Sequence, residues 1–307
     1  MVMYVMNKVD DIIIVENEPM ARHTSWRTGG VAKRYVQPRS LQALAAFMAT
    51  LDKNEKLLWL GLGSNTLVRD GGFDGTVIAT QGVMTQLELV GENSVYVGAG
   101  VASAKLARFC SRHGLAGAEF FAGIPGLLGG ALAMNAGAFG GETWPLVVAV
   151  ETMNRDGEII KRRADEFDYG YRSVKGLQQQ NEWFVSATLR LPEKVADANT
   201  IDIKQLLVKR AVSQPTGVAS CGSVFRNPEG AYAAQLIEAC GLKGKTVGGA
   251  VVSQKHANFI INENNATASD IETLIEQVQK TVAEKYGVVL QPEVKIVGKK
   301  KAGEKKS

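Results

Sequence analysis

Residues 117–141 read GAEFFAGIPGLLGGALAMNAGAFGG, and they hold a large share of the chain's 33 glycines. Glycine is costly in conformational entropy, so a fold concentrates it where the backbone turns sharply or approaches a ligand closely. Pro125 and Gly126 mark a tight turn, and the small residues at 129–131 follow it. The run suits close approach to a flat ring or a pyrophosphate. A buried helix of small residues explains it equally well, so both interpretations stay open.

A second glycine turn, GLGSNT at 61–66, comes directly after a short apolar run at 57–62. A strand that leads into such a turn can direct backbone N–H groups at a phosphate. Gly61 and Gly63 fit the dinucleotide fingerprint, but Thr66 occupies the position of its third glycine. The turn therefore predicts a phosphate contact and does not by itself predict a Rossmann fold.

The composition is that of an ordinary globular protein of about two domains, with 307 residues, 45% apolar and 21% charged. The net charge is +4, and the lysines gathered in residues 299–306 account for it. The remainder is near neutral, so the charge gives no case for nucleic-acid binding. The basic tail at 299–307 is expected to be solvated and disordered.

Cysteine and histidine usage argues against disulfides and metals. The odd number and wide spacing of Cys110, Cys221 and Cys240 favour a reducing compartment. The three histidines form no ligand pair, so we expect no metal site. No apolar window reaches 18 residues and the first residues lack a secretory pattern, so we expect no membrane span and a cytoplasmic location.

The hydrophobic pattern predicts an α+β fold in which hairpins dominate the middle. A short strand or helix is expected near 12–15, and the predicted strands lie at 31–36, 57–62, 75–80, 184–191, 247–252, 258–262 and 288–297. Hairpins are expected at 87–97 and 147–162. The expected helices are one from 41 capped by Ser40, 103–112 capped by Ser103, 201–211, 230–239, and one with a Ser269/Glu272 capping box that ends at Gly287.

Three polar segments could carry chemistry. Ser223 and Asn227 lie in SCGSVFRNP at 220–228, where a hydroxyl has anion-binding groups close by. Arg172 follows a tyrosine in YGYRS at 169–173, and a guanidinium binds a carboxylate in two places. Glu293 lies beside a proline in QPE. The plain alternatives are a polar turn, a surface arginine and an edge-strand charge.

Taken in order, eight segments resemble the flavoenzyme family of UDP-N-acetylenolpyruvoylglucosamine reductases. The matching segments are TSWRTGG at 24–30, LGLGSNTLVRD at 60–70, GIPGLLGGA at 123–131, MNAGAFGG at 134–141, YRS at 171–173, GSVFRNP at 222–228, KHANFIIN at 255–262 and QPEV at 291–294. The short span between Ser223 and Glu293 resembles the family type that lacks an additional tyrosine-bearing loop. The residue that replaces that tyrosine stays open.

The resemblance implies an FAD-binding domain of the p-cresol methylhydroxylase type followed by an α+β substrate domain. We expect a lead-in at 1–28, the FAD domain at 29–192, the substrate domain at 200–298 and the tail at 299–307. Ser223 is expected as the proton donor, with Arg172 and Glu293 as its active-site partners. The expected FAD contacts are Gly61, Gly63, Ser64, Asn65, Thr66, Gly123, Ile124, Pro125, Gly126, Gly129, Gly130, Ala131, Asn135 and Gly137. The expected substrate contacts are Tyr171, Arg226, Asn227, His256 and Asn258.

The implied activity is the NADPH-dependent reduction of UDP-N-acetylglucosamine enolpyruvate to UDP-N-acetylmuramate, in peptidoglycan synthesis. FAD is expected to bind without a covalent link, because the segment 60–70 offers neither His nor Cys. No protein partner is expected to be required. A flavin oxidase or dehydrogenase of the same fold is one alternative, and a nucleotide-sugar binding protein without activity is another.

Overall fold

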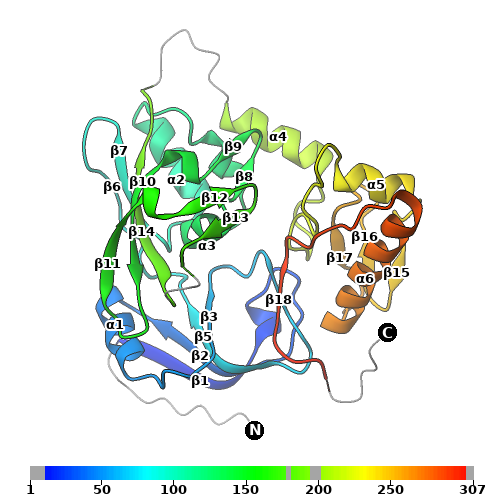
Figure 1. The fold of residues 1–307 in the computed structure, drawn as a ribbon, viewed down its shortest axis with the longest axis horizontal. Coiled ribbons are helices and arrows are strands. Elements are labelled where there is room, and N and C mark those ends of the chain that lie inside the picture. Colours follow the sequence, from blue (N-terminus) through cyan, green and yellow to red (C-terminus); the bar gives the residue numbers. More distant parts are fainter. Residues whose placement is uncertain (1–10, 178–180, 194–201, 302–307) are drawn as a thin grey trace. The chain divides into compact units, whose positions relative to one another are not determined.

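The structure is a computed structural model, and it describes residues 11–177, 181–193 and 202–301. Strands and helices intermix, which confirms the α+β class (Figure 1). The chain divides into two compact units, each built from segments far apart in sequence. Unit 1 comprises residues 1–15, 35–61 and 77–210, and unit 2 comprises 16–34, 62–76 and 211–307. No helix among the described residues is long and apolar enough to span a membrane.

Unit 1 contains a five-stranded sheet of order β11-β10-β14-β7-β6. Its strands are β6 (Leu87–Leu89), β7 (Ser94–Gly98), β10 (Val147–Met153), β11 (Ile159–Arg163) and β14 (Trp183–Arg190). All neighbouring pairs are antiparallel. Both expected hairpins are therefore confirmed. They form because alternating apolar residues bury one face of each strand.

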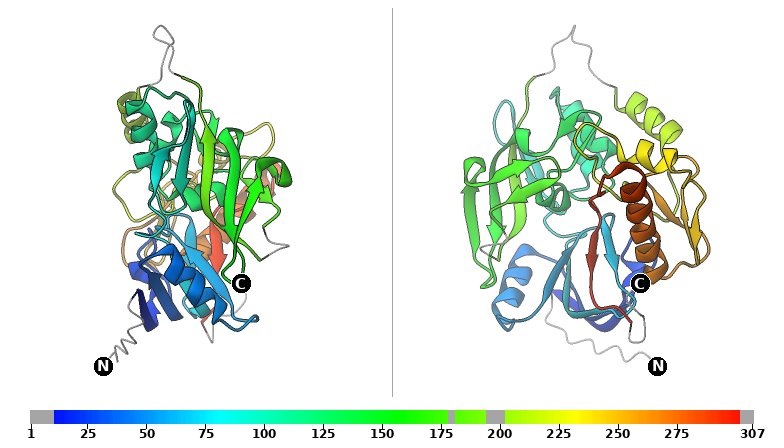
Figure 2. Two further views of the ribbon diagram at one scale, coloured as in Figure 1. Left: turned by 90° about the vertical axis from the view of Figure 1, so that its left-hand side faces the viewer. Right: turned by 45° about the vertical axis from the view of Figure 1, so that its right-hand side comes forward.

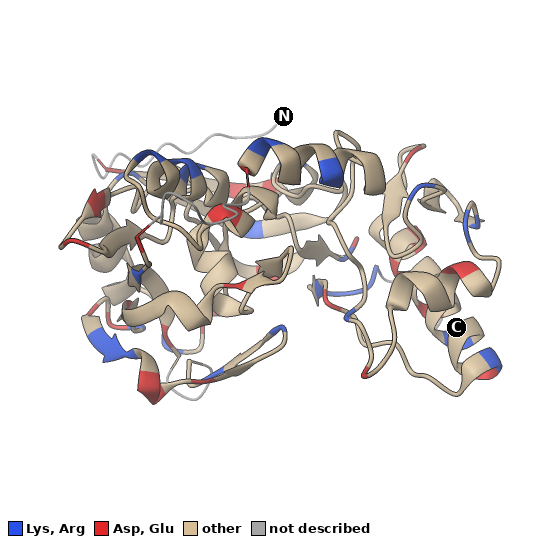
Figure 3. Cartoon of the chain, turned by 90° about the horizontal axis from the view of Figure 1, so that it is seen from above, with Lys and Arg blue, Asp and Glu red and all other residues tan. Residues whose placement is uncertain are grey.

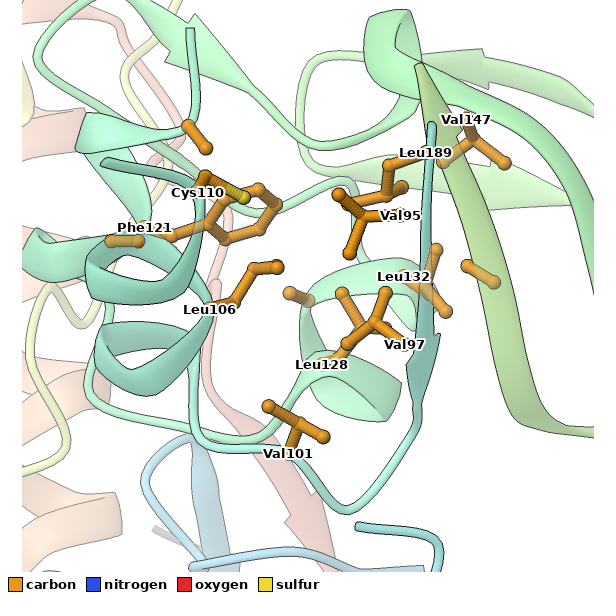
Figure 4. Packing of buried hydrophobic residues seen from close by; sticks show 14 of the residues in the cluster. Val95, Val97, Val101, Leu106, Cys110, Phe121, Leu128, Leu132, Val147 and Leu189 are labelled. Carbon is orange, nitrogen blue, oxygen red and sulfur yellow. The ribbon is translucent and has the colours of Figure 1, made fainter. Parts of the chain in front are cut away.

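The buried face of this sheet packs against two helices, α2 (Ser103–Arg112) and α3 (Leu128–Ala133). Val95 and Val97 of β7 meet Leu106 of α2 and Leu128 of α3 in one cluster (Figure 4). All four side chains are fully buried. The glycine-rich stretch thus supplies α3, the buried helix of small residues, and also the turns on either side of it.

A second sheet has the order β1-β2-β5-β3. Its strands are β1 (Ile12–Pro19), β2 (Val31–Pro38), β3 (Leu57–Leu60) and β5 (Phe73–Ala79). Helix α1 (Leu41–Ala49) begins after Ser40, whose Oγ accepts a hydrogen bond from Ala43 N at 3.1 Å. The expected Ser40 cap is confirmed. Along the chain, β1, β2 and β5 each pass from one unit into the other.

Unit 2 has its own core around helix α6 (Ala268–Tyr286). A three-stranded sheet of β15 (Thr246–Val247), β16 (Ala250–Val252) and β17 (Ile260–Asn262) belongs to it, with α5 (Ala233–Ala239). Strand β18 (Lys295–Val297) pairs in parallel with β4 (Thr66–Val68), so a segment from the N-terminal part of the chain joins the C-terminal part (Figure 2).

Short elements complete the described chain. These are η1 (Met20–Arg22), η2 (Glu119–Gly123), η3 (Trp144–Leu146), η4 (Ala164–Glu166), α4 (Ile203–Ser213), β8 (Gly137–Ala138), β9 (Gly141–Glu142), β12 (Asp168–Gly170) and β13 (Ser173–Lys175). Lys, Arg, Asp and Glu are interspersed along the described ribbon (Figure 3).

Two predicted helix caps are wrong. Ser103 is the first residue of α2 rather than its cap, and its buried Oγ has no hydrogen-bond partner among the described residues. The capping box of α6 is formed by Thr267 and Asp270, two residues before the predicted pair. Both patterns fit the sequence, but the Glu272 carboxylate pairs with Arg69 at 2.9 Å and is unavailable for capping. The predicted end at Gly287 is confirmed, because Gly287 adopts φ +69°.

Three predicted C-terminal elements differ in extent. The expected strand at 247–252 is instead β15 and β16, which pair as a hairpin through residues 248–249. Of the expected strand at 288–297, only β18 and an isolated bridge between Phe225 and Pro292 form, since Pro292 lacks an N–H. Helix α5 begins at Ala233 rather than at 230.

The compact units also divide the chain differently from the predicted linear boundaries. Residues 16–34 and 62–76 lie in unit 2, together with the C-terminal part of the chain. The basic tail beyond Lys301 and most of the predicted boundary at 192–200 lie outside the described residues.

Candidate active site

The turn at 61–66 is held tightly where it enters unit 2. Gly63 adopts φ +60°, and a Cβ there would lie 2.1 Å from the carbonyl oxygen of His23. Only glycine fits this position. Ser25 N donates to Gly63 O at 3.1 Å, and Cys221 Sγ lies 3.5 Å from the same oxygen. The turn thus has a fixed backbone, with Ser64 and Asn65 half-buried and Thr66 buried.

Burial raises the pKa of the Cys221 thiol to about 12. Beside Gly63 this cysteine is therefore a neutral packing group rather than a thiolate.

The glycine turn of unit 1 leaves backbone open to approach. Pro125 and Gly130 are exposed, and nothing lies within 4 Å of the place where a Cβ of Gly130 would be. Gly129 is held instead, because its N donates to Ala99 O at 2.8 Å. Gly123 and Gly126 are half-buried, and a Cβ on Gly123 would lie 2.5 Å from the Phe139 ring. A bulky anionic cofactor fits such a surface, because an uncovered glycine backbone can approach a phosphate closely.

Ser223 and Glu293 are brought together within unit 2 by the backbone. Glu293 N donates to Val224 O at 2.7 Å, and Arg226 N donates to Gln291 O at 2.9 Å. Phe225 and Pro292 form the antiparallel bridge between these two bonds. Both predicted catalytic side chains are half-buried. Residues 70 positions apart in sequence thus flank one short pairing.

The turn at 61–66 is joined to the same pairing through Asn65. Its Nδ2 donates to Glu293 O at 3.1 Å, while Lys295 N donates to Asn65 O at 3.0 Å. Asn65 was predicted as an FAD contact, and its side chain here holds the Glu293 segment. The second half of the turn at 61–66 therefore lies in one cluster of unit 2, together with Ser223 and Glu293.

Arg172 belongs to unit 1, where it occupies the turn between β12 and β13. It adopts φ +53°, and its Nη2 donates to Gly137 O at 2.7 Å. Its Nη1 donates more weakly to Asn135 O at 3.4 Å. The guanidinium carbon lies 5.1 Å from the centre of the exposed Tyr171 ring. These two carbonyl oxygens help to fix the orientation of the guanidinium group.

Asn135 is fully buried rather than exposed to a cofactor. Its Nδ2 donates to Gly170 O and to Glu142 Oε2, each at 3.0 Å, and its Oδ1 accepts from Trp144 N at 3.0 Å. This side chain ties the hairpin that carries Arg172 to the 135–144 segment. Its neighbour Ala131, also predicted as a cofactor contact, is 2% exposed.

The predicted substrate contacts in unit 2 have different settings. Asn227 is exposed, and its Oδ1 accepts from Ala233 N at 3.1 Å at the start of α5. Arg226 has a buried Nε with no hydrogen-bond partner among the described residues. Burial, with a smaller effect of Lys243, lowers the pKa of His256, so its imidazole is neutral at pH 7.

Asn258 is 4% exposed, and both ends of its amide bond the backbone of Phe225.

The sequence predicted no separate role for residues 23–30, the segment that bonds the turn at 61–66 through Ser25 N. Trp26 is fully buried, and its Nε1 donates to Ile260 O at 2.8 Å. Asn262 Nδ2 donates to Trp26 O at 2.8 Å. These bonds therefore anchor residues 23–30 in unit 2. The only signal in the sequence was the tryptophan within a polar glycine-containing loop.

Comparison with known proteins was made on the whole sequence and on the fold. The family model of the "UDP-N-acetylenolpyruvoylglucosamine reductase, C-terminal domain" matches residues 214–297, and that of the "FAD binding domain" matches residues 32–162. Proteins named UDP-N-acetylenolpyruvoylglucosamine reductase are similar throughout. The one from Methylococcus capsulatus is 57% identical over 94% of both chains, and the one from Alkalilimnicola ehrlichii is 58% identical over 92% of this chain and 93% of its own.

The crystal structure of the Thermus caldophilus reductase resembles the present fold with a TM-score of 0.75 and 31% sequence identity. The match covers 93% of this chain and 98% of that one. The similarity thus spans the FAD-binding and C-terminal domains together.

Proposed function

Since the chain belongs to the UDP-N-acetylenolpyruvoylglucosamine reductase family, we propose that it reduces the enolpyruvyl ether of UDP-N-acetylglucosamine to UDP-N-acetylmuramate with NADPH. The enzyme is an FAD-dependent oxidoreductase of peptidoglycan synthesis. The catalytic roles proposed for Ser223 and Glu293 rest on the backbone pairing of their two segments through Val224.

Two turns would hold FAD. In unit 2 this is the turn with Gly63, Ser64 and Asn65, and in unit 1 it is the turn from Gly123 to Gly130. The open space at Gly130 and the left-handed backbone of Gly63, which has no side chain, support this assignment. FAD bound there would supply the hydride chemistry, between NADPH and the terminal vinyl carbon of the substrate.

Arg172 would bind the substrate carboxylate. Hydride addition builds negative charge on the carbon beside that carboxylate, and the charge spreads into the carboxylate oxygens. A guanidinium stabilises this charge more in the transition state than in the ground state, and only such a difference accelerates the reaction. The carbonyl oxygens of Asn135 and Gly137 support the role, because they orient the guanidinium.

Ser223 would deliver a proton from its Oγ to the carbon beside the carboxylate. A bare carboxylate at Glu293 would repel the developing negative charge, so Glu293 contributes only by sharing a proton or by orienting a partner. The backbone bond between Glu293 N and Val224 O supports a joint role, since it holds the two residues in one pairing.

Arg226, Asn227, Tyr171 and His256 are proposed to contact the UDP-sugar. Arg226 has an unsatisfied buried Nε, which suits a fork of hydrogen bonds to a phosphate. Because Nδ1 of neutral His256 accepts from Asn258 N, its Nε2–H would donate one hydrogen bond to the sugar. The ring of Tyr171, with 47% of the residue exposed, would pack on the ligand.

The purified yellow protein tests the proposal. Anaerobic NADPH should bleach the flavin absorbance, and the enolpyruvyl substrate should restore it while the reduced sugar forms. Ser223→Ala should leave bleaching by NADPH intact and slow the restoration by about 10²–10⁴-fold, the range for a lost general acid.

The alternatives give different results. A flavin oxidase would regain its colour only with oxygen, and a binding protein without activity would not be bleached. Comparable loss of both half-reactions in Ser223→Ala would contradict the proton-donor role.

A further inference from the structure

Asn258 is a buried side chain whose hydrogen-bonding capacity is directed at one residue. Its Oδ1 accepts from Phe225 N at 2.9 Å, and its Nδ2 donates to Phe225 O at 2.8 Å. Its own carbonyl oxygen accepts from Val224 N at 2.9 Å. These three bonds close around the two residues that follow Ser223. The segment after the predicted proton donor is therefore held from one side by Asn258.

The opposite side of the same segment is held by the Glu293 strand. Val224 O accepts from Glu293 N at 2.7 Å, so Val224 is bonded to Asn258 through its N–H and to Glu293 through its carbonyl. Phe225 is 2% exposed and Val224 is 1% exposed, so water does not compete for these bonds. Asn258, Val224 and Glu293 form a continuous hydrogen-bonded row with Ser223 at its edge.

Asn258 is itself fixed by the turn at 253–259. Ser253 Oγ accepts from Lys255 N at 3.1 Å and from His256 N at 3.3 Å. Asn258 N donates to His256 Nδ1 at 3.3 Å, and Ser253 N donates to Phe259 O at 2.9 Å. A turn bonded in this way defines where the Asn258 amide lies before any ligand binds.

We propose that Asn258 is a positioning residue, which holds Ser223 at a set place beside Glu293, and that it does not bind the substrate itself. The inference rests on the proposed function, because it requires Ser223 to be the proton donor. A carboxamide suits the role, since it offers one donor and one acceptor to the two sides of a single residue. Aspartate keeps the acceptor but presents a second oxygen to Phe225 O, so one bond becomes a repulsion.

Asn258→Asp and Asn258→Ser test the proposal in the holoenzyme. Each variant is reduced with NADPH and then mixed rapidly with the enolpyruvyl substrate. We expect reduction by NADPH to be unchanged within about 2-fold, and reoxidation by the substrate to slow by about 10²-fold in the aspartate variant, the cost of a displacement of about 1 Å. The serine variant should fall between the aspartate variant and the wild type.

The dependence on substrate concentration separates positioning from binding. A positioning residue changes the limiting rate of reoxidation and leaves the half-saturating substrate concentration nearly constant. A rise in that concentration with an unchanged limiting rate would show that Asn258 binds substrate, and would overturn the proposal.

Asn262→Asp is the matched control. Asn262 also makes two side-chain bonds to the backbone of unit 2, from Nδ2 to Trp26 O at 2.8 Å and from Ala266 N to Oδ1 at 2.7 Å. We expect it to lower the thermal midpoint like the Asn258 variant while both half-reactions persist. If Asn258→Asp and Asn262→Asp lost reoxidation equally, Asn258 would have only a structural role.

Ser223→Ala separates failure of the inference from failure of the proposed function. If Ser223→Ala retains reoxidation, the proton-donor assignment is wrong. If Ser223→Ala loses reoxidation but the Asn258 variants do not, only the positioning role is wrong. In the double variant Ser223→Ala/Asn258→Asp we expect no further loss beyond Ser223→Ala, because the position of an absent hydroxyl is immaterial.

Discussion

The two units each hold a predicted catalytic group with a buried asparagine, but they do so by opposite means. In unit 1 Asn135 adopts φ +46°, ties the Arg172 hairpin through Gly170 O, and lends its own carbonyl to the guanidinium. In unit 2 Asn258 bonds Val224 and Phe225, the two residues beyond Ser223. A long cation needs acceptors along its length to be oriented. A short hydroxyl is placed by its backbone alone.

Among the variants of unit 1, the largest effect is expected where a charge is removed. Arg172→Ala should slow reoxidation by the substrate by about 10²–10³-fold, as for the loss of one donor to a developing oxyanion. Arg172→Lys should recover only part of the rate, because an ammonium cannot bind a carboxylate in two places.

Rapid mixing of each NADPH-reduced Arg172 variant with substrate measures this. An unchanged rate of reoxidation in Arg172→Ala would show that the guanidinium of unit 1 does not contribute to this half-reaction.

The two glycine turns are expected to respond differently to one added methyl group. In Gly63→Ala the Cβ meets His23 O at φ +60°, so the protein should lose about 1–3 kcal/mol of stability. In Gly130→Ala the Cβ enters open space within α3, so the folded apoprotein should be as stable as the wild type or more so.

The Gly130 variant should nevertheless bind less flavin if the cofactor occupies that space. Thermal unfolding of the apoproteins and FAD titration together measure both effects. Full flavin affinity in Gly130→Ala would place the cofactor elsewhere than on this turn.

The smallest effect concerns the asparagine of unit 1. Asn135→Gly keeps the left-handed backbone that glycine tolerates and removes only the carboxamide, whereas Asn135→Ala also strains the backbone. We expect about a 10-fold slower reoxidation in Asn135→Gly, equivalent to about 1.4 kcal/mol, and greater destabilisation in Asn135→Ala.

A double-mutant cycle with Arg172→Ala tests the connection. If Asn135→Gly still slows the Arg172→Ala enzyme by the same factor, Asn135 acts independently of the hairpin.

Much of the local structure could be predicted from the sequence because it depends on neighbouring residues. Ser40 starts α1, Gly287 ends α6, and the two hairpins of unit 1 form at their turns. The prediction of a Ser269/Glu272 capping box failed because both residues have other partners. Arg69 pairs with the Glu272 carboxylate, and Asp70 accepts from Ser269 N. Those partners lie about 200 positions away in the chain, so no local pattern contains them.

By itself the sequence determined the α+β class, the two glycine turns, and the residue types that bind anions and move protons. Only the tertiary structure decided that Val224 would pair the Ser223 segment with Glu293, and that the side-chain amides of Asn135 and Asn258 would bond backbone groups. The physical reason is that a carboxamide bonds whatever donor and acceptor the fold leaves unsatisfied beside it. That choice is made by packing between segments up to 70 residues apart.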